Sequence, residues 1–201
     1  MRTSRAPLFL AIIENSVVEI SYNNSGAATN AGLLVVPWLP VFVPSKPSLF
    51  LVHDNNFQGS GPFANGIFLQ DDPNNHELFA LVLHNTIEAN DIGADAVAAV
   101  FTTGTTIVNN KISGAGPDAI GIYDSTYAAV LGNDVAKFTA NSASGLAQIV
   151  LDGSLFGLPD TSHSAVVCRT PSDTVLNLGL NNKVIGCQEV EGGAATASKK
   201  L

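Results

Sequence analysis

The residues best equipped for chemistry lie in the segment DDPNNHE, residues 71–77. It places the carboxylates Asp71 and Asp72 a few positions from the imidazole of His76, and a second imidazole, His53, precedes it in the chain. Carboxylate and imidazole are common side chains in general acid–base catalysis. A long polar turn explains the same composition, because Asp, Asn and Pro are turn formers. Two interpretations therefore stay open, a catalytic loop and a turn.

A second group of candidates consists of carboxylates at the ends of short apolar segments. They are Asp71, Asp124 and Asp152, with Tyr123 beside Asp124 and Thr102 in the intervening segment. Stacked in a column, such carboxylates could hold calcium or carry out acid–base hydrolysis. Asp also ends strands simply because it forms turns. Trp38, the only tryptophan, is a candidate sugar-stacking platform, or else it packs with Val41 and Phe42 over an apolar flank.

The element that must position these residues is a repeat, seen best in TTIVNNKISGAGPDAIGIYDSTYAAVLGNDV, residues 105–135. Asn110 and Asn133 occupy equivalent places in it, at an interval of 133 − 110 = 23. A unit that short, made of strands and corners, is one coil of a β-solenoid. The pattern predicts an all-β fold, a right-handed single-stranded parallel β-helix of roughly six to seven coils. We align Asn23, Asn55, Asn85, Asn110, Asn133 and Asn182 as one structural ladder.

Asparagine suits this position for two physical reasons. It tolerates the left-handed backbone of a sharp corner, and stacked amides can bond one another from coil to coil. The alternative is that these residues are turn formers in an antiparallel domain, but hairpins impose no common period. We expect Asn85, Asn110 and Asn133 to form a continuous buried ladder.

The run VNNKISG…AIGIYDS…VLGND resembles the parallel β-helix repeat of the pectin-lyase-like superfamily, over residues 8–187. That superfamily includes pectate lyases, polygalacturonases, alginate epimerases, phage tailspikes and non-catalytic surface proteins. DDPNNHE is similar to the Asp-Pro-His-Glu signature of the epimerases, which implies an acid–base pair of Asp72 and His76 with His53 close by. Asn74 and Asn75 interrupt that signature. The Asn-Thr-Asp and Gly-His-Gly signatures of polygalacturonases are missing from the chain.

The net charge and the composition limit the classes of molecule that the protein can bind. The chain has 201 residues, 46% hydrophobic and 13% charged, with a net charge of −8. An acidic surface repels a phosphate backbone, so nucleic acid is excluded as a partner. Acidic polysaccharides are repelled too unless cations bridge the surfaces. We expect no cofactor; calcium enters only if the chain is a lyase-like enzyme.

The ends of the chain suggest its organisation. Residues 6–13 superficially resemble a signal peptide, but they align with a third strand and predict a half-coil without a cap. We therefore expect a β-helix domain over residues 1–190, the C-terminal part of a longer solenoid, and a disordered tail over 191–201. No stretch is long enough to span a membrane.

Cys168 and Cys187 are separated by 187 − 168 = 19 in the sequence, close to one coil; they either bond across neighbouring coils or are both free.

An apolar stripe is the last feature. Residues two and four positions before each Asn point outward, and most are apolar: Leu51, His53, Leu81, Leu83, Thr106, Val108, Ala129, Leu131, Leu178 and Leu180. Such a stripe marks a contact surface, which we expect residues 38–42 to cover, or else a second chain.

The leading hypothesis is a structural or carbohydrate-binding segment of an extracellular or cell-envelope protein, without a catalytic site and without its export signal. The alternative is a lyase, epimerase or hydrolase acting on a uronic-acid polysaccharide.

Overall fold

The computed structural model describes residues 8–11, 17–28, 31–36, 48–61, 65–71, 78–141, 147–152 and 161–191. Within these ranges every regular element is a β-strand, and the strands form three parallel sheets. Trp38, Asp72, His76, and the tail from residue 192 lie outside the described residues. The prediction of an all-β parallel β-helix is confirmed.

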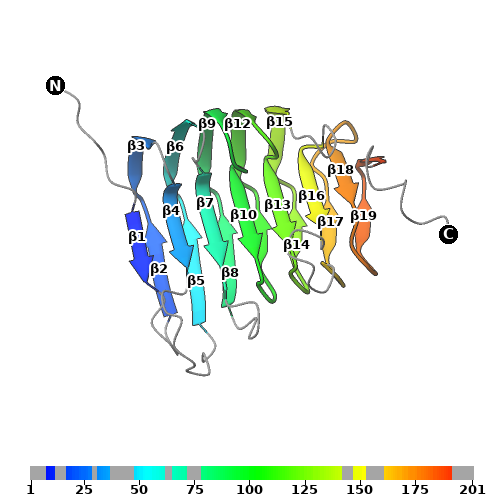
Figure 1. Cartoon of the computed structure of the whole chain (residues 1–201), viewed down its shortest axis with the longest axis horizontal. Helices are drawn as coiled ribbons and strands as arrows, with labels where there is room; N and C mark the ends of the chain where they lie inside the picture. Colours follow the sequence, from blue (N-terminus) through cyan, green and yellow to red (C-terminus); the bar gives the residue numbers. More distant parts are fainter. Residues whose placement is uncertain are drawn as a thin grey trace.

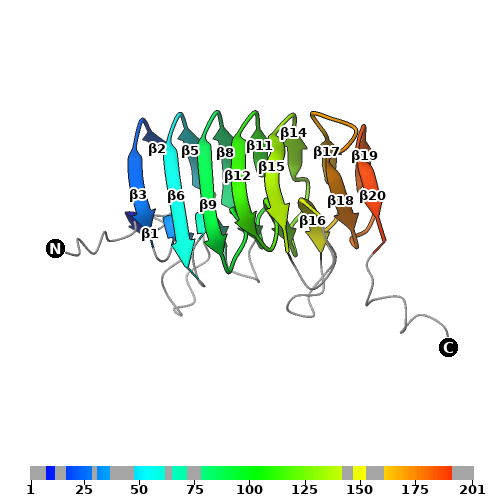
Figure 2. The same cartoon turned by 90° about the horizontal axis from the view of Figure 1, so that it is seen from above.

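Each of the five coils from β2 to β16 contributes one strand to each sheet in a fixed order. Figure 1 shows the strands of sheet A side by side in chain order. Sheet A contains β1 (Leu8–Ala11), β4 (Ala31–Val36), β7 (Asn65–Gln70), β10 (Val97–Val100), β13 (Ile120–Tyr123), β16 (Ile149–Asp152), β18 (Thr174–Asn177) and β20 (Gln188–Val190). Sheet B contains β2 (Val17–Ser21), β5 (Ser48–His53), β8 (Leu78–Leu83), β11 (Thr106–Val108), β14 (Ala129–Leu131), β17 (Ala165–Val167) and β19 (Lys183–Ile185). Sheet C, in front in Figure 2, contains β3 (Asn24–Ala28), β6 (Asn56–Gly61), β9 (Thr86–Ile92), β12 (Lys111–Gly116) and β15 (Asp134–Ala140). Among the described residues the last two coils therefore have strands only in sheets A and B.

The predicted half-coil at the start of the chain is confirmed. β1 pairs in parallel with β4, with Leu8 opposite Leu33. It thus occupies the place of a third strand, like β13 in the region where the repeat is clearest.

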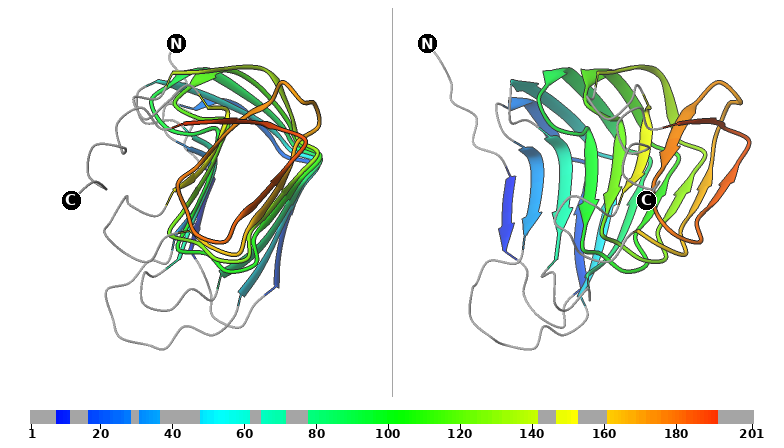
Figure 3. Two further views of the ribbon diagram at one scale, coloured as in Figure 1. Left: turned by 90° about the vertical axis from the view of Figure 1, so that its right-hand side faces the viewer. Right: turned by 45° about the vertical axis from the view of Figure 1, so that its right-hand side comes forward.

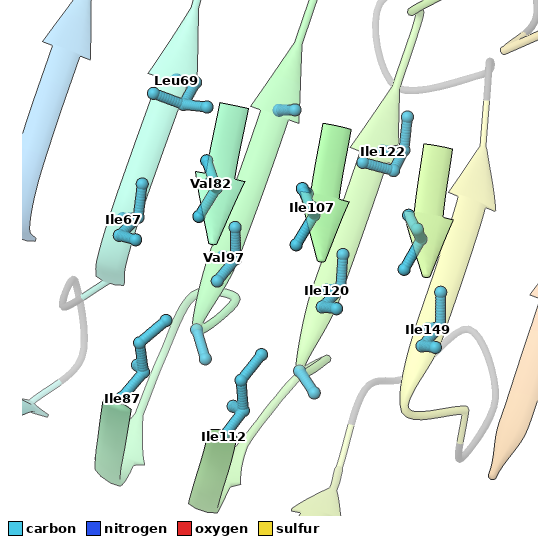
Figure 4. Packing of buried hydrophobic residues seen from close by; sticks show 14 of the residues in the cluster. Ile67, Leu69, Val82, Ile87, Val97, Ile107, Ile112, Ile120, Ile122 and Ile149 are labelled. Carbon is cyan, nitrogen blue, oxygen red and sulfur yellow. The ribbon is translucent and has the colours of Figure 1, made fainter. Parts of the chain in front are cut away.

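The core is a set of aliphatic columns that run along the inside of the coil. Viewed close to the coil axis, successive coils lie over one another (Figure 3). Equivalent residues of neighbouring coils therefore stack at the inter-strand spacing of about 4.8 Å. Burying each Val or Ile contributes about 1.5–3 kcal/mol relative to exposing it. Figure 4 shows three columns: Val82 with Ile107, Ile87 with Ile112, and Ile67 with Val97, Ile120 and Ile149.

The asparagine ladder occupies the corner between sheets B and C. Asn110 is 1% exposed; its Nδ2 donates to Val82 O at 2.9 Å and to Asn133 Oδ1 at 3.0 Å. Its Oδ1 accepts from both the backbone N and Nδ2 of Asn85. The same contacts continue to Asn55 and Asn23. The prediction of a continuous buried ladder through Asn85, Asn110 and Asn133 is confirmed.

The placement of Asn182 in this ladder was wrong. Asn182 precedes β19, and its Oδ1 accepts from the backbone N of Ser164, which precedes β17. The ladder residues instead follow the strands of sheet B; two residues beyond β17 and β19 stand Arg169 and Cys187. The predicted alignment slipped because NLGLNNKVIG has apolar residues on both sides of its asparagines, so either side matches the strand pattern.

The same slip misplaced two leucines of the predicted stripe. Leu178 and Leu180 do not lie on a strand of sheet B. Leu178 packs against the hydrophobic cluster formed by Val100, Tyr123 and Leu176, and Leu180 lies exposed at the corner that leads into sheet B.

A second ladder, made of hydroxyl groups, lies at the corner between sheets A and B. The backbone N of Thr102 donates to Ser125 Oγ at 2.9 Å, and the backbone N of Ser125 donates to Thr161 Oγ1 at 3.3 Å. These hydroxyls satisfy backbone donors that the buried corner would otherwise leave without partners.

Cys168 and Cys187 form a disulfide between the last two coils, with a Cα–Cα distance of 5.3 Å. Of the two alternatives that the sequence left open, the structure shows the bonded one. The crosslink closes the part of the solenoid whose coils lack a sheet C strand among the described residues.

Candidate functional site

The first predicted catalytic residue, Asp71, directly follows β7 and is 3% exposed. Its Oδ2 accepts a hydrogen bond from the backbone N–H of Leu78, the first residue of β8. The carboxylate therefore closes the loop between the two strands, a structural role of the kind that the turn interpretation predicted. Its predicted partners Asp72 and His76 lie outside the described residues.

His53, the fourth predicted catalytic residue, lies at the far end of the sheet B strand. Its Nδ1 is 2.8 Å from Asp54 Oδ2, and its Nε2 is 3.0 Å from Glu19 Oε1. The hydrogen bonds to Asp54 and then to Glu19 raise the pKa of His53 above its usual value. β8 runs from Leu78, bonded to Asp71, to Leu83, opposite His53. Five residue steps separate the ends, about 17 Å. Asp71 and His53 therefore do not share a site.

The predicted column of carboxylates is interrupted and partly out of register. Asp152 lies opposite Tyr123, one position before Asp124. Between the coils of Asp71 and Asp124, the equivalent residue is Phe101, not Thr102. Phe101 and Asp124 both adopt positive φ, 58° and 47°, at the same corner. Asp124 thus occupies a left-handed turn position, where Asp is tolerated better than most residues.

A pair of buried carboxyl groups escaped the sequence analysis. Asp95 and Asp118 precede β10 and β13 at equivalent positions of neighbouring coils, because Val97 lies opposite Ile120. They are 7% and 3% exposed. The hydroxyl of Tyr123 donates to Asp95 Oδ2 at 2.7 Å and lies 3.3 Å from Asp118 Oδ2. Tyr123, predicted to bind a ligand, is 9% exposed and belongs to this cluster. The sequence interval could have revealed the pair, because 118 − 95 = 23 equals the interval between Asn110 and Asn133 and so places the two carboxyls at equivalent positions of neighbouring coils.

Burial governs the electrostatics of this cluster. Desolvation, and then the charge of Asp118, raise the pKa of Asp95 to about 7. Desolvation and the neighbouring Asp95 raise the pKa of the Tyr123 hydroxyl, which therefore stays a donor. Two adjacent buried carboxyls are best accommodated when they share a proton. Gly121 makes room for the arrangement, since a Cβ there would overlap Asp95 Oδ2 and the Tyr123 ring.

The outer face of sheet B carries most of the exposed large apolar side chains of the described solenoid. Along β8 burial alternates, with Leu78, Ala80 and Val82 inside and the residues between them outside. Strand pairing then defines two outward columns over all seven strands, beside a shorter column of Val17, Leu49 and Phe79 on the first three. The central column is Glu19, Leu51, Leu81, Thr106, Ala129, Ala165 and Lys183. The flanking column is Ser21, His53, Leu83, Val108, Leu131, Val167 and Ile185.

The predicted stacking of the stripe is confirmed. Leu51 lies opposite Leu81, and Leu83 lies opposite Val108, which lies opposite Leu131. All five are half-buried, shielded by neighbours on adjacent strands. Residues 38–42, the predicted cover, lie outside the described residues, so that prediction stays a prediction.

Exposed large hydrophobic residues gather on this face. Every one among the described residues lies on a sheet B strand or a corner beside it: Val17, Tyr22, Leu49, Phe79, Tyr127, Val167, Leu180 and Ile185. Val17 is 71% exposed and Tyr127 62%. Exposed apolar side chains concentrated on one sheet mark a contact surface.

Compared with known proteins, the chain matches no family model, no curated protein and no solved structure. Among the described residues, no three His, Cys, Asp or Glu side chains are grouped to hold a metal ion. Nor do those residues form a helix that is long and apolar enough to cross a membrane. The described residues define the class: a parallel β-solenoid with an internal asparagine ladder and exposed apolar side chains on the outer face of sheet B.

Proposed function

We propose that the protein is a non-catalytic structural module that presents the outer face of sheet B to another protein surface. The observation that supports this is the gathering of the exposed large hydrophobic residues of the described chain on sheet B and its corners. Protein interfaces are enriched in aromatic and apolar side chains at their centres, and a sheet held by ladders at its corners is a rigid platform for one.

A protein partner suits this face better than a carbohydrate. Around Thr106, the centre of the face consists of Leu81, Leu83, Val108 and Leu131, so a single side-chain hydroxyl is offered there to sugar hydroxyls. The carboxyl groups of Asp71, Asp95, Asp118 and Asp124 are buried, a poor arrangement for contact with a polymer. Within the pectin-lyase-like superfamily, which the repeat resembles, this proposal places the chain among the non-catalytic members.

The disulfide between Cys168 and Cys187 supports an oxidising location, such as the cell surface or the extracellular space. A crosslink of this kind is rare in reducing compartments. We therefore extend the proposal to an exported or surface protein.

A site-specific photo-crosslink tests the contact. A photoreactive amino acid replaces Leu83, at the centre of the face, in cells that make the protein; a matched variant carries it at Lys111, exposed on sheet C. We expect irradiation to give protein adducts at position 83 and few at position 111. Equal adduct yields at both positions, or none at 83, would overturn the proposal. Release of unsaturated or reducing products from uronic-acid polysaccharides would instead support the enzyme alternative.

A further inference from the structure

We propose that the partner of the sheet B face is a second copy of this chain. The two copies are related by a two-fold axis parallel to the sheet B strands, so that their coil axes run in opposite directions. This inference rests on the proposed function, because it names the occupant of the same face. Three properties of the face support it: the distribution of charge, of side-chain size and of area.

Charge is distributed unevenly along the central column. It begins with the carboxylate of Glu19, exposed in β2, and ends with the ammonium group of Lys183, exposed in β19. The residues between them are uncharged. A two-fold axis through Thr106 brings Glu19 of one copy to Lys183 of the other, and the contact occurs twice. Opposite charges across an interface favour this register and disfavour others.

The charged neighbours at each end leave its sign unchanged. Near Glu19, His53 bridges to Asp54, so two carboxylates accompany one imidazole. At the opposite end, Arg169 follows β17 and lies 3.4 Å from Asp134, with its side chain 58% exposed. If the two-fold axis ran along the coil instead, Glu19 would approach Glu19 of the second copy. The like-charge contact makes that orientation unfavourable.

Side-chain sizes in the central column are complementary under the same axis. The half near Glu19 carries large residues, Leu51 and Leu81, and the half near Lys183 carries small ones, Ala129 and Ala165. The axis through Thr106 sets Leu81 against Ala129 and Leu51 against Ala165 of the second copy. Large residues thus face small ones, as close packing of two surfaces requires. In the flanking column, Leu83 meets Leu131, and Val108 meets its own copy.

The area suits a modest dimer. Seven strands extend about 29 Å along the coil, and three outward positions with their corners extend roughly 17 Å across it. Each copy then contributes roughly 500 Å², and the pair buries about 1,000 Å², the lower limit of a specific interface. We therefore expect association in the micromolar range rather than a permanent dimer.

Analytical ultracentrifugation of the full chain with its disulfide intact tests the inference. We expect a monomer–dimer equilibrium whose dissociation constant rises about 100-fold in Leu83→Glu, which adds a charge at the apolar centre twice per dimer. Lys183→Glu should raise it about tenfold, since two favourable contacts become repulsive. Adding Glu19→Lys to Lys183→Glu should restore the wild-type value within about threefold. Lys137→Glu, the same change of charge at an exposed position of sheet C, is the matched control and should change nothing.

Each outcome separates this inference from the proposed function. Wild type that stays monomeric at every concentration overturns the inference; if crosslinks at position 83 then reach a different protein, the proposed function stands. A dimer insensitive to Leu83→Glu overturns the inference, because the two copies then associate through a different surface; the crosslinks at position 83 alone decide the proposed function. A dimer that Leu83→Glu disrupts, but that the double charge exchange fails to restore, overturns the antiparallel orientation. Circular dichroism melting of each variant confirms that it folds.

Discussion

Two of the buried stacks of polar side chains in this protein, one inside the coil and one against the outer side of sheet A, solve the same problem differently. The asparagine ladder between sheets B and C joins identical amides through five coils. The Asp95–Asp118 pair before sheet A joins identical carboxyls of two neighbouring coils, beside Tyr123. Both are buried, and both follow the same interval in the sequence, since 133 − 110 and 118 − 95 both equal 23.

The difference is one of hydrogen-bonding capacity. An amide carries both a donor and an acceptor, so any number of amides can stack head to tail and satisfy one another. An ionised carboxylate only accepts, so two stacked carboxylates repel until one takes up a proton. The ladder is therefore insensitive to pH and extendable, whereas the carboxyl pair is limited in length and dependent on pH. The following substitutions replace amide by carboxyl in the ladder, or carboxyl by amide in the pair, or remove one of the hydrogen-bonding groups.

The largest expected effect comes from Asn110→Asp, which inserts a carboxylate into the ladder. It removes the donors to Val82 O and Asn133 Oδ1 and sets a charge against those oxygens. We expect a loss of about 4 kcal/mol in the free energy of unfolding at pH 8, as for an unpaired buried charge. At pH 4 the protonated acid can donate again, and about half should return. Urea denaturation at both pH values measures this; an equal loss at both would contradict the comparison.

Asn110→Ala removes the amide without adding charge. It leaves the backbone N and Nδ2 of Asn85 without the Oδ1 acceptor and removes the Nδ2 donor to Asn133, whose Oδ1 keeps only the bond from the backbone N of residue 110. We therefore expect a loss of about 2–3 kcal/mol, the same at pH 4 and pH 8. Asn23→Ala is the matched control, because Asn23 is the exposed end of the same ladder. It should cost less than about 1 kcal/mol. Similar losses for the two variants would show that the ladder does not act through buried amides.

The carboxyl pair should make the wild-type protein less stable as the pH rises. The pKa of Asp95 is about 7 when folded and 3.8 in its unperturbed state, so the folded chain binds more protons in that interval. The contribution of Asp95 to stability is therefore fully present below about pH 4 and is lost as the pH rises toward 7 and above. Asp118→Asn removes the like charge and supplies a donor. We expect it to raise stability at pH 8 by about 1–2 kcal/mol and to flatten the pH dependence. Asp134→Asn, a half-buried control in β15, should leave the slope unchanged.

Tyr123→Phe should have the smallest effect. It removes the hydroxyl that donates to Asp95 Oδ2, at a cost of about 1 kcal/mol. Because that bond favours the ionised form, the loss should be greater at pH 8 than at pH 4, and the pKa of Asp95 should rise further. Titration of the Asp95 carboxyl by NMR measures the shift, and a lowered pKa would contradict this account.

The sequence alone predicted the repeat, the parallel coil and the buried ladder from Asn85 to Asn133. It did so because asparagine at a corner and aliphatic residues at fixed offsets are local requirements of each coil. The alternation along each strand also identified the outward residues Leu51, Leu81, Leu83, Val108 and Leu131. Those members of the candidate surface were therefore predictable without coordinates.

Only the tertiary structure decided which equivalent residues meet and what surrounds them. The same interval relates Asn110 to Asn133 and Asp95 to Asp118, but only the structure shows that the two carboxyls are buried side by side, which raises the pKa of Asp95. The last two coils have no described sheet C strand, and the sequence interval there no longer identifies equivalent residues. Only the pairing of β17 with β19 shows the position of Asn182 and brings Cys168 close enough to Cys187 for the disulfide. The physical reason is that a repeat specifies neighbours along the coil, whereas burial depends on how each coil closes around them.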